Sequence, residues 1–466
     1  MKVIHTQADP VSKLWGEGSI CQTDYRLLRY ALCQPIDGGV LYLNVVTGEL
    51  VYLTTEEAAC ISSDPVPYTP AMDELIRRRF LVPADTDEQK IVEQLRRALR
   101  LTNHRKDITG YTILPTSNCN ARCFYCYESD YCHVNMSEET AAQVVDFIAA
   151  HCGGKPVRLS WFGGEPLVGK ARIDQICSSL AERGISFGST MTSNGFLFSE
   201  ELAAHARESW KLRKIQITLD GTEEIYNRTK AYTDTSVSGY QRVTENIGHL
   251  IKNGIRVSIR MNLGPHNADD LTLLARELAE RFPDKKLLRP YVYVLFDNVG
   301  YDPAHYDREQ LEGLINRQRE LERLLVERGF PPIKEALPSL KFQRCMADND
   351  ASVLINPKGE LGKCEHYSFD WLVGTLAEGI TDPESVTEWK KRKTYPNCED
   401  CPLAPSCFYL VRCTPARDCT ETMRDRLIEN NQALMERKYR QFLEAESAKA
   451  AREEAAVNDA PDADDC

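Results

Sequence analysis

The 466-residue sequence lacks the apolar segments that would place it in a membrane. It has no run of about 18 apolar residues, which is the least a transmembrane helix needs. Its first residues, MKVIHTQADPVSK, lack the apolar stretch of a signal peptide. Positive charge is also scarce, because 57 Lys and Arg stand against 69 Asp and Glu, a net charge of −12. Phosphate binding needs a basic surface, so we do not expect a nucleic-acid partner. Because apolar segments are missing, we expect a cytoplasmic protein that does not bind a membrane.

Cysteine, in contrast, is abundant, with 17 residues. Without a secretion signal, so many cysteines favour metal binding or catalysis in a reducing compartment over a disulfide framework. A hydrophobic fraction of 42% and a charged fraction of 27% are typical of a soluble globular protein. The length predicts two or three domains.

The pattern of apolar residues divides the chain into segments. Residues 25–54 alternate apolar and polar residues around two turns, and short helical patterns follow, so 1–85 is predicted to be a small winged-helix-like module. A charged linker helix is predicted over 86–107. From Tyr111 strands and helices alternate strictly, which predicts a parallel sheet with right-handed crossovers. The strands are expected at 111–117, 157–162, 186–192, 214–220, 256–262 and 286–296.

This alternation places an α/β domain, a partial (β/α)6 barrel, at residues 108–300. A long polar helix at 307–328 lies in a helical bridge over 301–344, and a cysteine-dense region covers 345–425. Residues 426–466 are predicted to form a C-terminal helix that ends in a disordered acidic tail.

Three cysteines stand together just after the first strand of the alternating region. Cys119, Cys123 and Cys126 form the pattern Cys-x3-Cys-x2-Cys. An iron–sulfur cluster normally takes four cysteine ligands, so a compact set of three leaves one iron open. Parallel βα barrels carry their sites at the C-terminal ends of strands, which is where this motif lies.

With Tyr125 before the last cysteine, this spacing resembles the signature of the radical SAM superfamily. The resemblance implies a [4Fe–4S] cluster whose open iron binds S-adenosylmethionine (AdoMet) and reduces it to a 5′-deoxyadenosyl radical. It also implies that Tyr125 stacks on the adenine, although packing in the core is an alternative.

Polar motifs end the next three strands. Gly163 and Gly164 let the backbone approach a ligand closely, and Glu165 can accept hydrogen bonds from an ammonium group. The resemblance implies that this segment holds the amino group of AdoMet, and that two later strand ends meet its ribose or carboxylate. The candidates there are Ser193, Asn194, Thr218 and Arg228. An ordinary turn at 163–166 and a surface ion pair of Arg228 are the alternatives.

Seven further cysteines lie in the C-terminal region and resemble the SPASM extension of radical SAM enzymes. The resemblance implies two auxiliary [4Fe–4S] clusters, three clusters in all. The outer cluster would be held by Cys398, Cys401, Cys407 and Cys419, and the inner one by Cys345, Cys364 and Cys413.

Two departures from the family pattern concern the inner cluster. Cys407 and Cys413 are separated by five residues where three are usual, and no eighth cysteine stands shortly before Cys345. An open iron there would bind a substrate thiolate, unless another residue fills the position. Glu365 follows Cys364 where sulfatase-maturing relatives carry an acidic base, so it is a candidate general base, with an exposed glutamate as the alternative.

The resemblance predicts a maturase of a ribosomally synthesised precursor peptide. The leader of the peptide would add a strand to the N-terminal module, and a flavodoxin or ferredoxin would supply electrons. The predicted product is a thioether between a cysteine and a peptide carbon. A carbon–carbon cross-link or formylglycine formation is an alternative, and so is a non-catalytic zinc-binding scaffold.

Overall fold

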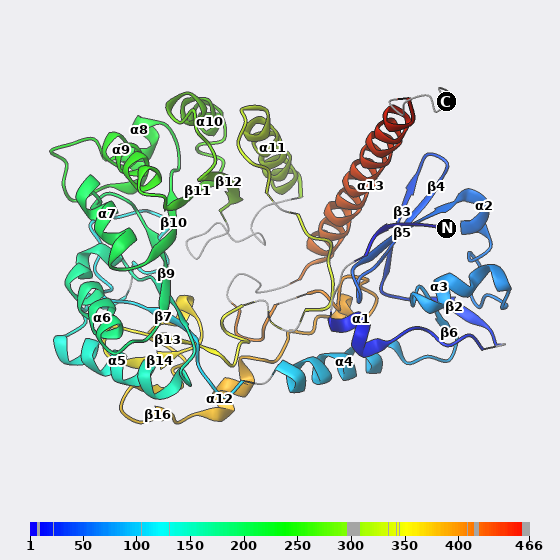
Figure 1. The fold of residues 1–466 in the computed structure, drawn as a ribbon, viewed down its shortest axis with the longest axis horizontal. Coiled ribbons are helices and arrows are strands. Elements are labelled where there is room, and N and C mark those ends of the chain that lie inside the picture. Colours follow the sequence, from blue (N-terminus) through cyan, green and yellow to red (C-terminus); the bar gives the residue numbers. More distant parts are fainter. Residues whose placement is uncertain are drawn as a thin grey trace, which may run out of the picture.

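Two groups of strands lie at opposite ends of the molecule (Figure 1). The computed structural model describes residues 1–6, 10–21, 23–103, 105–129, 131–295, 308–333, 335–341, 343, 345–407, 409–413 and 419–458. Parallel strands and their helices occupy one end, and the N-terminal strands occupy the other, beside the C-terminal helix α13 (Glu421–Asn458).

The larger sheet has ten strands in the order β12-β11-β10-β9-β8-β7-β13-β14-β15-β16. Strands β7 to β12 are parallel and follow one another in sequence, so the predicted strand positions are confirmed. Their bounds are β7 (Gly110–Ile113), β8 (Val157–Trp161), β9 (Phe187–Ser193), β10 (Leu212–Thr218), β11 (Arg256–Leu263) and β12 (Leu288–Val294).

The cysteine-rich C-terminal region extends this same sheet. Strand β13 (Ser352–Ile355) pairs with β7 in parallel, and the short strands after it are antiparallel. These are β14 (Glu360–Gly362), β15 (Gly374–Thr375) and β16 (Gly379–Ile380). The first cysteine loop, which follows β7, and Cys364, which follows β14, are therefore positioned by strands of the same sheet.

Helices connect the parallel strands, and serine side chains begin three of them. Ser137, Ser199 and Ser238 each accept a hydrogen bond from the backbone N–H three residues later, which satisfies one of the unpaired donors at a helix start. The helices are α5 (Glu138–His151), α6 (Lys170–Glu182), α7 (Glu200–Glu208), α8 (Glu223–Lys230), α9 (Gly239–Lys252) and α10 (Asp270–Arg281).

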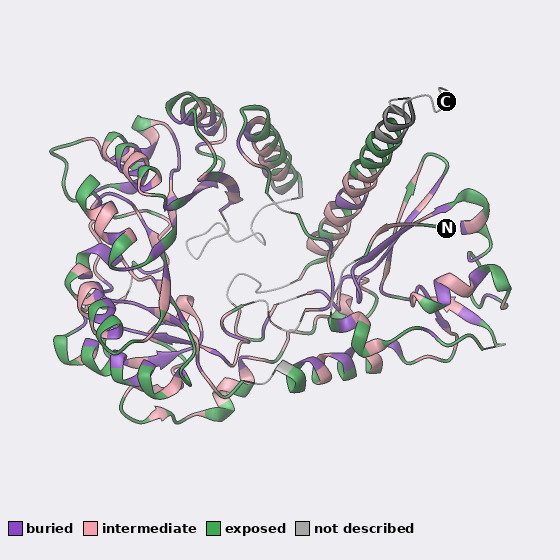
Figure 2. Ribbon diagram, viewed as in Figure 1, coloured by how far each residue is buried: buried purple, intermediate pink, exposed green. Residues whose placement is uncertain are grey.

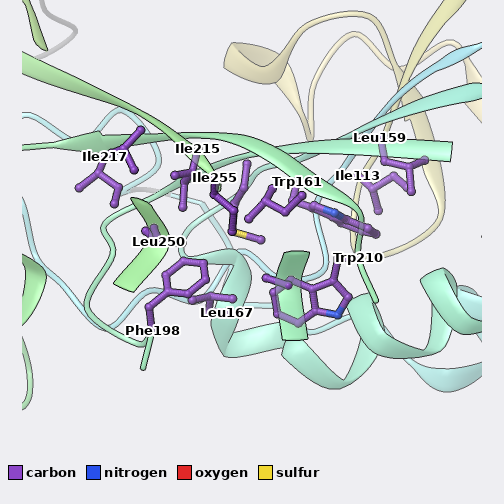
Figure 3. Close-up of a cluster of buried hydrophobic side chains, with 14 of the residues drawn as sticks. Ile113, Leu159, Trp161, Leu167, Phe198, Trp210, Ile215, Ile217, Leu250 and Ile255 are labelled. Atoms are coloured by element: carbon purple, nitrogen blue, oxygen red, sulfur yellow. The ribbon is translucent and has the colours of Figure 1, made fainter. Parts of the chain in front are cut away.

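Apolar side chains from these strands and helices form one continuous core. Figure 3 shows Trp161 and Trp210 among aliphatic side chains such as Leu159 and Ile215, all of them fully buried. The same core includes Trp389 of the C-terminal region. Buried residues follow the strands, while exposed residues follow the outer faces of the helices (Figure 2). The base of the first cysteine loop therefore rests on a close-packed support.

The N-terminal part contains a four-stranded antiparallel sheet in the order β1-β5-β4-β3 and a separate pair, β2 with β6. A buried apolar cluster joins one face of the sheet to Met435 of α13. Its elements are β1 (Lys2–His5), α1 (Pro10–Trp15), β2 (Tyr25–Leu27), β3 (Ala31–Ile36), β4 (Gly39–Asn44), β5 (Glu49–Thr54), α2 (Thr55–Ala59), α3 (Asp73–Arg77) and β6 (Leu81–Pro83).

The remaining helices are α4 (Glu88–Asn103), α11 (Arg308–Glu327) and α12 (Pro383–Glu388). Helices α4 and α11 match the predicted linker and bridge helices. Helix α13 reaches Asn458, and residues 459–466 of the predicted tail lie outside the described part. Within the described residues, none of the helices combines the length and the apolar character that crossing a bilayer requires.

Arginines link the N-terminal part to the C-terminal cysteine region. Arg96 of α4 donates to the carbonyl oxygens of Ala404 and Pro405 at 2.9 and 3.2 Å. Arg100 donates to Lys390 O at 2.7 Å. Burial lowers the pKa of Arg96 to about 10, so its guanidinium stays charged near neutral pH. These contacts fix α4 against the loop that carries Cys401 and Cys407.

Replacing Arg96 tests this link. Arg96→Met removes two charge-assisted hydrogen bonds and leaves two carbonyls without that donor, so we expect a loss of about 2 kcal/mol in the free energy of unfolding. Thermal unfolding and limited proteolysis would measure it. Arg97→Met, at an exposed position of the same helix, is the matched control. Equal stability of the two variants would contradict the role given to Arg96.

Candidate functional site

The loop between β7 and α5 carries Cys119, Cys123 and Cys126, all partly buried. Burial raises the pKa of Cys119 to about 12, and the nearby charges of the other two cysteines add to it. Burial also raises the pKa of Cys126 to about 11. The three sulfurs therefore share one weakly solvated place, where thiolates need a positively charged partner.

Gly163 and Gly164 pack against this loop. A Cβ atom on Gly163 would lie 2.3 Å from Thr116 O, and the φ of +113° at this residue also disfavours a side chain. A Cβ atom on Gly164 would lie 2.5 Å from Asn118 O. The two glycines thus let the end of β8 approach the segment just before Cys119, which is a structural reason for both.

Glu165 is completely buried, and its carboxylate joins the ends of β8 and β9. Its carboxylate accepts hydrogen bonds from Leu167 N at 3.1 Å, Ser193 Oγ at 2.8 Å and Asn194 N at 2.8 Å. Burial raises its pKa to about 7, although these hydrogen bonds act in the opposite direction. A carboxylate has about four acceptor positions, so one remains for a further donor such as an ammonium group.

Asn194 connects the end of β9 to the first cysteine. Its side-chain amide donates to Asn120 Oδ1 at 2.7 Å and lies 3.9 Å from Cys119 Sγ. Thr218, at the end of β10, is partly buried. Arg228 is exposed on α8, and its role at the site stays a prediction.

The buried cation of this helix is Lys230, two residues after Arg228. Its side chain is 4% exposed and lies 3.1 Å from Asp220 Oδ2, whose side chain is 1% exposed. Lys230 Nζ also donates to Tyr125 OH at 2.7 Å, and that hydroxyl donates to Asp220. Burial by itself lowers the pKa of Lys230, but Asp220 and Cys123 outweigh it and raise the pKa well above the usual value.

Tyr125, predicted to stack on adenine, therefore takes part in a buried ion pair through its hydroxyl. Backbone contacts join the same elements, because Arg122 N donates to Lys230 O at 2.9 Å. Neither Asp220 nor Lys230 was selected from the sequence. The only signal for Asp220 was its place in the strand-end motif TLDG, and Lys230 required the helical register of α8.

The C-terminal cysteines fall into two groups. Within each group, the negative charge of one sulfur raises the pKa of another. Burial raises the pKa of Cys419, and the charges of Cys398, Cys407 and Cys401 add to it; these four form the predicted outer set. Burial raises the pKa of Cys364, and the charges of Cys345 and Cys413 add to it; these three form the predicted inner set. The thiols of each predicted set thus lie near one another in space.

Five of the ten cysteines share a local backbone geometry. The N–H two residues after the cysteine donates to its sulfur, as Ala121 N does to Cys119 Sγ at 3.4 Å. The same contact is made by Glu128, Ala347, His366 and Leu403 to the cysteines two residues before them. Such hydrogen bonds stabilise the deprotonated sulfur and are one of the means by which proteins tune iron–sulfur clusters.

The donors therefore fit iron–sulfur groups in their chemistry, since grouped thiols receive backbone N–H bonds in weakly solvated surroundings. Among the described residues, no three Cys, His, Asp or Glu side chains converge closely enough to share a single metal ion.

Unpartnered polar atoms lie between the first cysteine loop and the inner set. Tyr127 Oη, Glu128 Oε1, Glu365 Oε2 and His366 Nδ1 are buried without a hydrogen-bond partner among the described residues. The rings of Tyr127 and His366 are 4.3 Å apart, so the loop of the first cysteines contacts the segment after Cys364. Burial, and then the charge of Glu365, raise the pKa of Glu128 to about 7.

The ion pair of Lys230 generates a prediction. Lys230→Met leaves Asp220 buried without its cation, so we expect a loss of about 3–5 kcal/mol in the free energy of unfolding. Adding Asp220→Asn should restore more than half of it. Lys252→Met, which breaks an exposed pair with Glu200, should cost less than about 1 kcal/mol. Anaerobic denaturation by urea would measure all four proteins, and similar losses for Lys230→Met and Lys252→Met would refute the assignment.

Comparisons with known proteins agree with this arrangement. A GTP 3′,8-cyclase from Clostridium perfringens is 28% identical over 308 residues, which cover 62% of this chain and 90% of the cyclase. An uncharacterised protein from Methanothermobacter thermautotrophicus is 29% identical over 153 residues, 31% of this chain, and the match spans only 54% of that relative.

Among solved structures, that of anSMEcpe with bound AdoMet and a Cp18Cys peptide superposes with a TM-score of 0.55. It is 14% identical and covers 72% of this chain and 99% of its own, so the likeness concerns the fold. Residues 113–278, from β7 into α10, match the family model of the radical SAM superfamily. That segment includes the first cysteine loop, Glu165, Asp220 and Lys230, and the chain therefore contains a radical SAM domain.

Proposed function

We propose that this protein is a radical SAM peptide maturase that forms a thioether in a ribosomally synthesised precursor peptide. The observation that carries the proposal is the grouping of ten cysteines into three sets, one of them in the radical SAM domain and two in the region 345–425. The proposed architecture is a partial (β/α)6 barrel over 108–300, with a winged-helix-like peptide-recognition module at 1–85 and a SPASM-type domain at 345–425.

Each set would hold one [4Fe–4S] cluster. Cys119, Cys123 and Cys126 would hold the one that binds AdoMet, which when bound supplies a 5′-deoxyadenosyl radical. The remaining acceptor position of Glu165 suits the amino group of AdoMet, and Lys230 is the buried cation best placed for its carboxylate. Gly163, Gly164, Ser193, Asn194, Thr218 and Tyr125 stay candidates for further contacts.

The chain's own residues have two roles in this proposal. Buried side chains such as Glu165 and Lys230 exclude water from the first cysteine loop, which protects a reactive radical from side reactions. Glu128, Tyr127 and His366 lie between this loop and the inner set, where a peptide residue would have to sit to react.

Thioether formation releases hydrogen and one electron, and the site must accept both. The peptide carbon loses one hydrogen atom to the deoxyadenosyl radical, and the cysteine thiol loses one proton. One electron remains and needs an acceptor, which is the purpose we assign to the auxiliary cysteine sets. The product peptide is therefore two hydrogens lighter than its precursor.

The N-terminal sheet offers one edge for a leader peptide. Its edge strands are β1 and β3, and α13 contacts both of them. Gln432 Nε2 donates to the backbone Cys33 O of β3 at 2.8 Å, and the side chain of Lys2 in β1 forms an ion pair with Glu446. Among the described strands, β1 pairs only with β5. An extended leader would therefore add beside β1, with main-chain hydrogen bonds providing affinity.

The test combines metal analysis with a peptide assay. Anaerobically reconstituted protein should contain about 12 irons per chain with matching sulfide, whereas a zinc scaffold would contain zinc. With AdoMet, reduced flavodoxin and a cysteine-bearing precursor peptide, mass spectrometry should show the loss of two hydrogens. The triple variant Cys119→Ala/Cys123→Ala/Cys126→Ala should keep about 8 irons and lose AdoMet cleavage.

Controls separate the alternatives. A precursor with its cysteine replaced by serine should lose the cross-link, and a cross-link that survives would indicate carbon–carbon bond formation. An aldehyde in the product would indicate formylglycine. GTP in place of the peptide tests the activity named for the cyclase relatives, and its conversion would overturn the peptide assignment.

A further inference from the structure

The inner cysteine set has three members where a cubane has four irons to ligate. Cys345, Cys364 and Cys413 act on one another through their charges. The fourth cysteine near them, Cys407, acts on Cys413 but belongs with the outer set. The cysteines therefore provide three ligands for the inner set, and a fourth protein ligand has to be another type of residue.

Glu365 is the carboxylate next to this set. Cys364 is the N-cap residue of the short 3-10 helix η3 (Glu365–Tyr367), so its neighbour Glu365 begins in the first turn beside it. Glu365 Oε2 is buried and has no hydrogen-bond partner among the described residues. Burial is the largest cause that raises the pKa values of the three inner thiols, and the charge of Glu365 adds to it at each one.

Three other charged groups near the inner set have partners of their own. Asp348 Oδ1 accepts a hydrogen bond from Cys345 N at 3.1 Å, and Asp350 forms an ion pair with Lys390. The buried Lys363 directs Nζ to two backbone carbonyls, Asn349 O at 2.7 Å and Ser352 O at 2.6 Å.

An unpartnered carboxylate oxygen is costly to bury, and it would repel the three sulfurs once they lose their protons to bind a metal. A positively charged centre shared by all four groups removes that cost. Iron accepts carboxylate oxygen as well as thiolate, although the softer thiolate is the better ligand of iron–sulfur clusters.

From these contacts we infer that the Glu365 carboxylate is the fourth protein ligand of the inner auxiliary cluster. The inference rests on the proposed function only in requiring that the inner cysteines hold an iron–sulfur cluster. A carboxylate bound there is exchangeable for a stronger ligand. When a substrate thiol replaces it, one iron–oxygen bond breaks, one iron–sulfur bond forms and the thiol proton passes to water.

Spectroscopy of the auxiliary clusters tests this ligand directly. The background is the triple variant Cys119→Ala/Cys123→Ala/Cys126→Ala of the full chain, which leaves the two auxiliary sets as the iron sites. Glu365→Gln should shift the EPR g-values and raise the reduction potential of one of the two clusters. Glu365→Cys should shift the g-values differently and lower that potential, because a thiolate donates more charge than a carboxylate.

A small thiol supplies a second measurement. Titration with 2-mercaptoethanol should change the spectrum of Glu365→Gln at a concentration at least about tenfold lower than that of the parent, because no carboxylate competes. Glu365→Cys should not respond. Glu128→Gln is the matched control, because it removes a buried carboxylate close to Glu365 and should leave the g-values unchanged.

The outcomes are decisive in both directions. Unchanged g-values and potentials in both Glu365 variants would overturn the inference, as would equal loss of iron from both. Loss of iron in Glu365→Gln with retention in Glu365→Cys would support it. A general base would leave these spectra unchanged, since no peptide is present. For the same reason, failure to form a thioether leaves this result standing, so the two failures are distinguishable.

Discussion

The ion pair between Lys230 and Asp220 is the contact on which the first cysteine loop depends. It joins the end of α8 to the end of β10, and Tyr125 brings the loop itself into the pair. Helix α8 then ends at Ala231, whose φ of +44° turns the chain so that Thr233 N donates to Asn120 O at 2.9 Å. Loop, strand end and helix end therefore hold one another in position around a single buried positive charge.

The buried sulfurs impose a second constraint. Burial makes a thiolate costly, and the backbone N–H groups that point at five of the cysteines offset only part of that cost. Under the proposed function, the group that the thiolates hold would offset the rest, and cluster binding and local folding would be coupled. The same reasoning applies to Glu365, whose unpartnered oxygen lies beside three of these thiols.

Sequence periodicity predicted the six parallel strands and most of their helices because each buries one regular face in a common core. It did not predict α8 as a helix, and Arg228 was selected there through the family resemblance and because a guanidinium can bind a carboxylate with two hydrogen bonds. Residues two apart on a helix point about 200° apart, so only the register of α8 reveals that Lys230 faces the site and Arg228 faces solvent. The grouping of Glu365 with Cys345 and Cys413 was predicted only through the family resemblance, because these residues come from loops far apart in sequence.

The basic run Lys390-Lys391-Arg392-Lys393 shows how an acidic chain supplies positive charge to its cysteines. Arg392 donates to Cys407 O at 2.6 Å, and Lys393 donates to Cys413 O at 3.0 Å. Arg96 reaches the same loop from the N-terminal part. The cations are thus directed into the backbone at Cys407 and Cys413, where they would stabilise negative charge on the proposed auxiliary clusters. A net charge of −12 is compatible with this arrangement, because the positive charge that matters lies beside the ligands rather than in a basic surface patch.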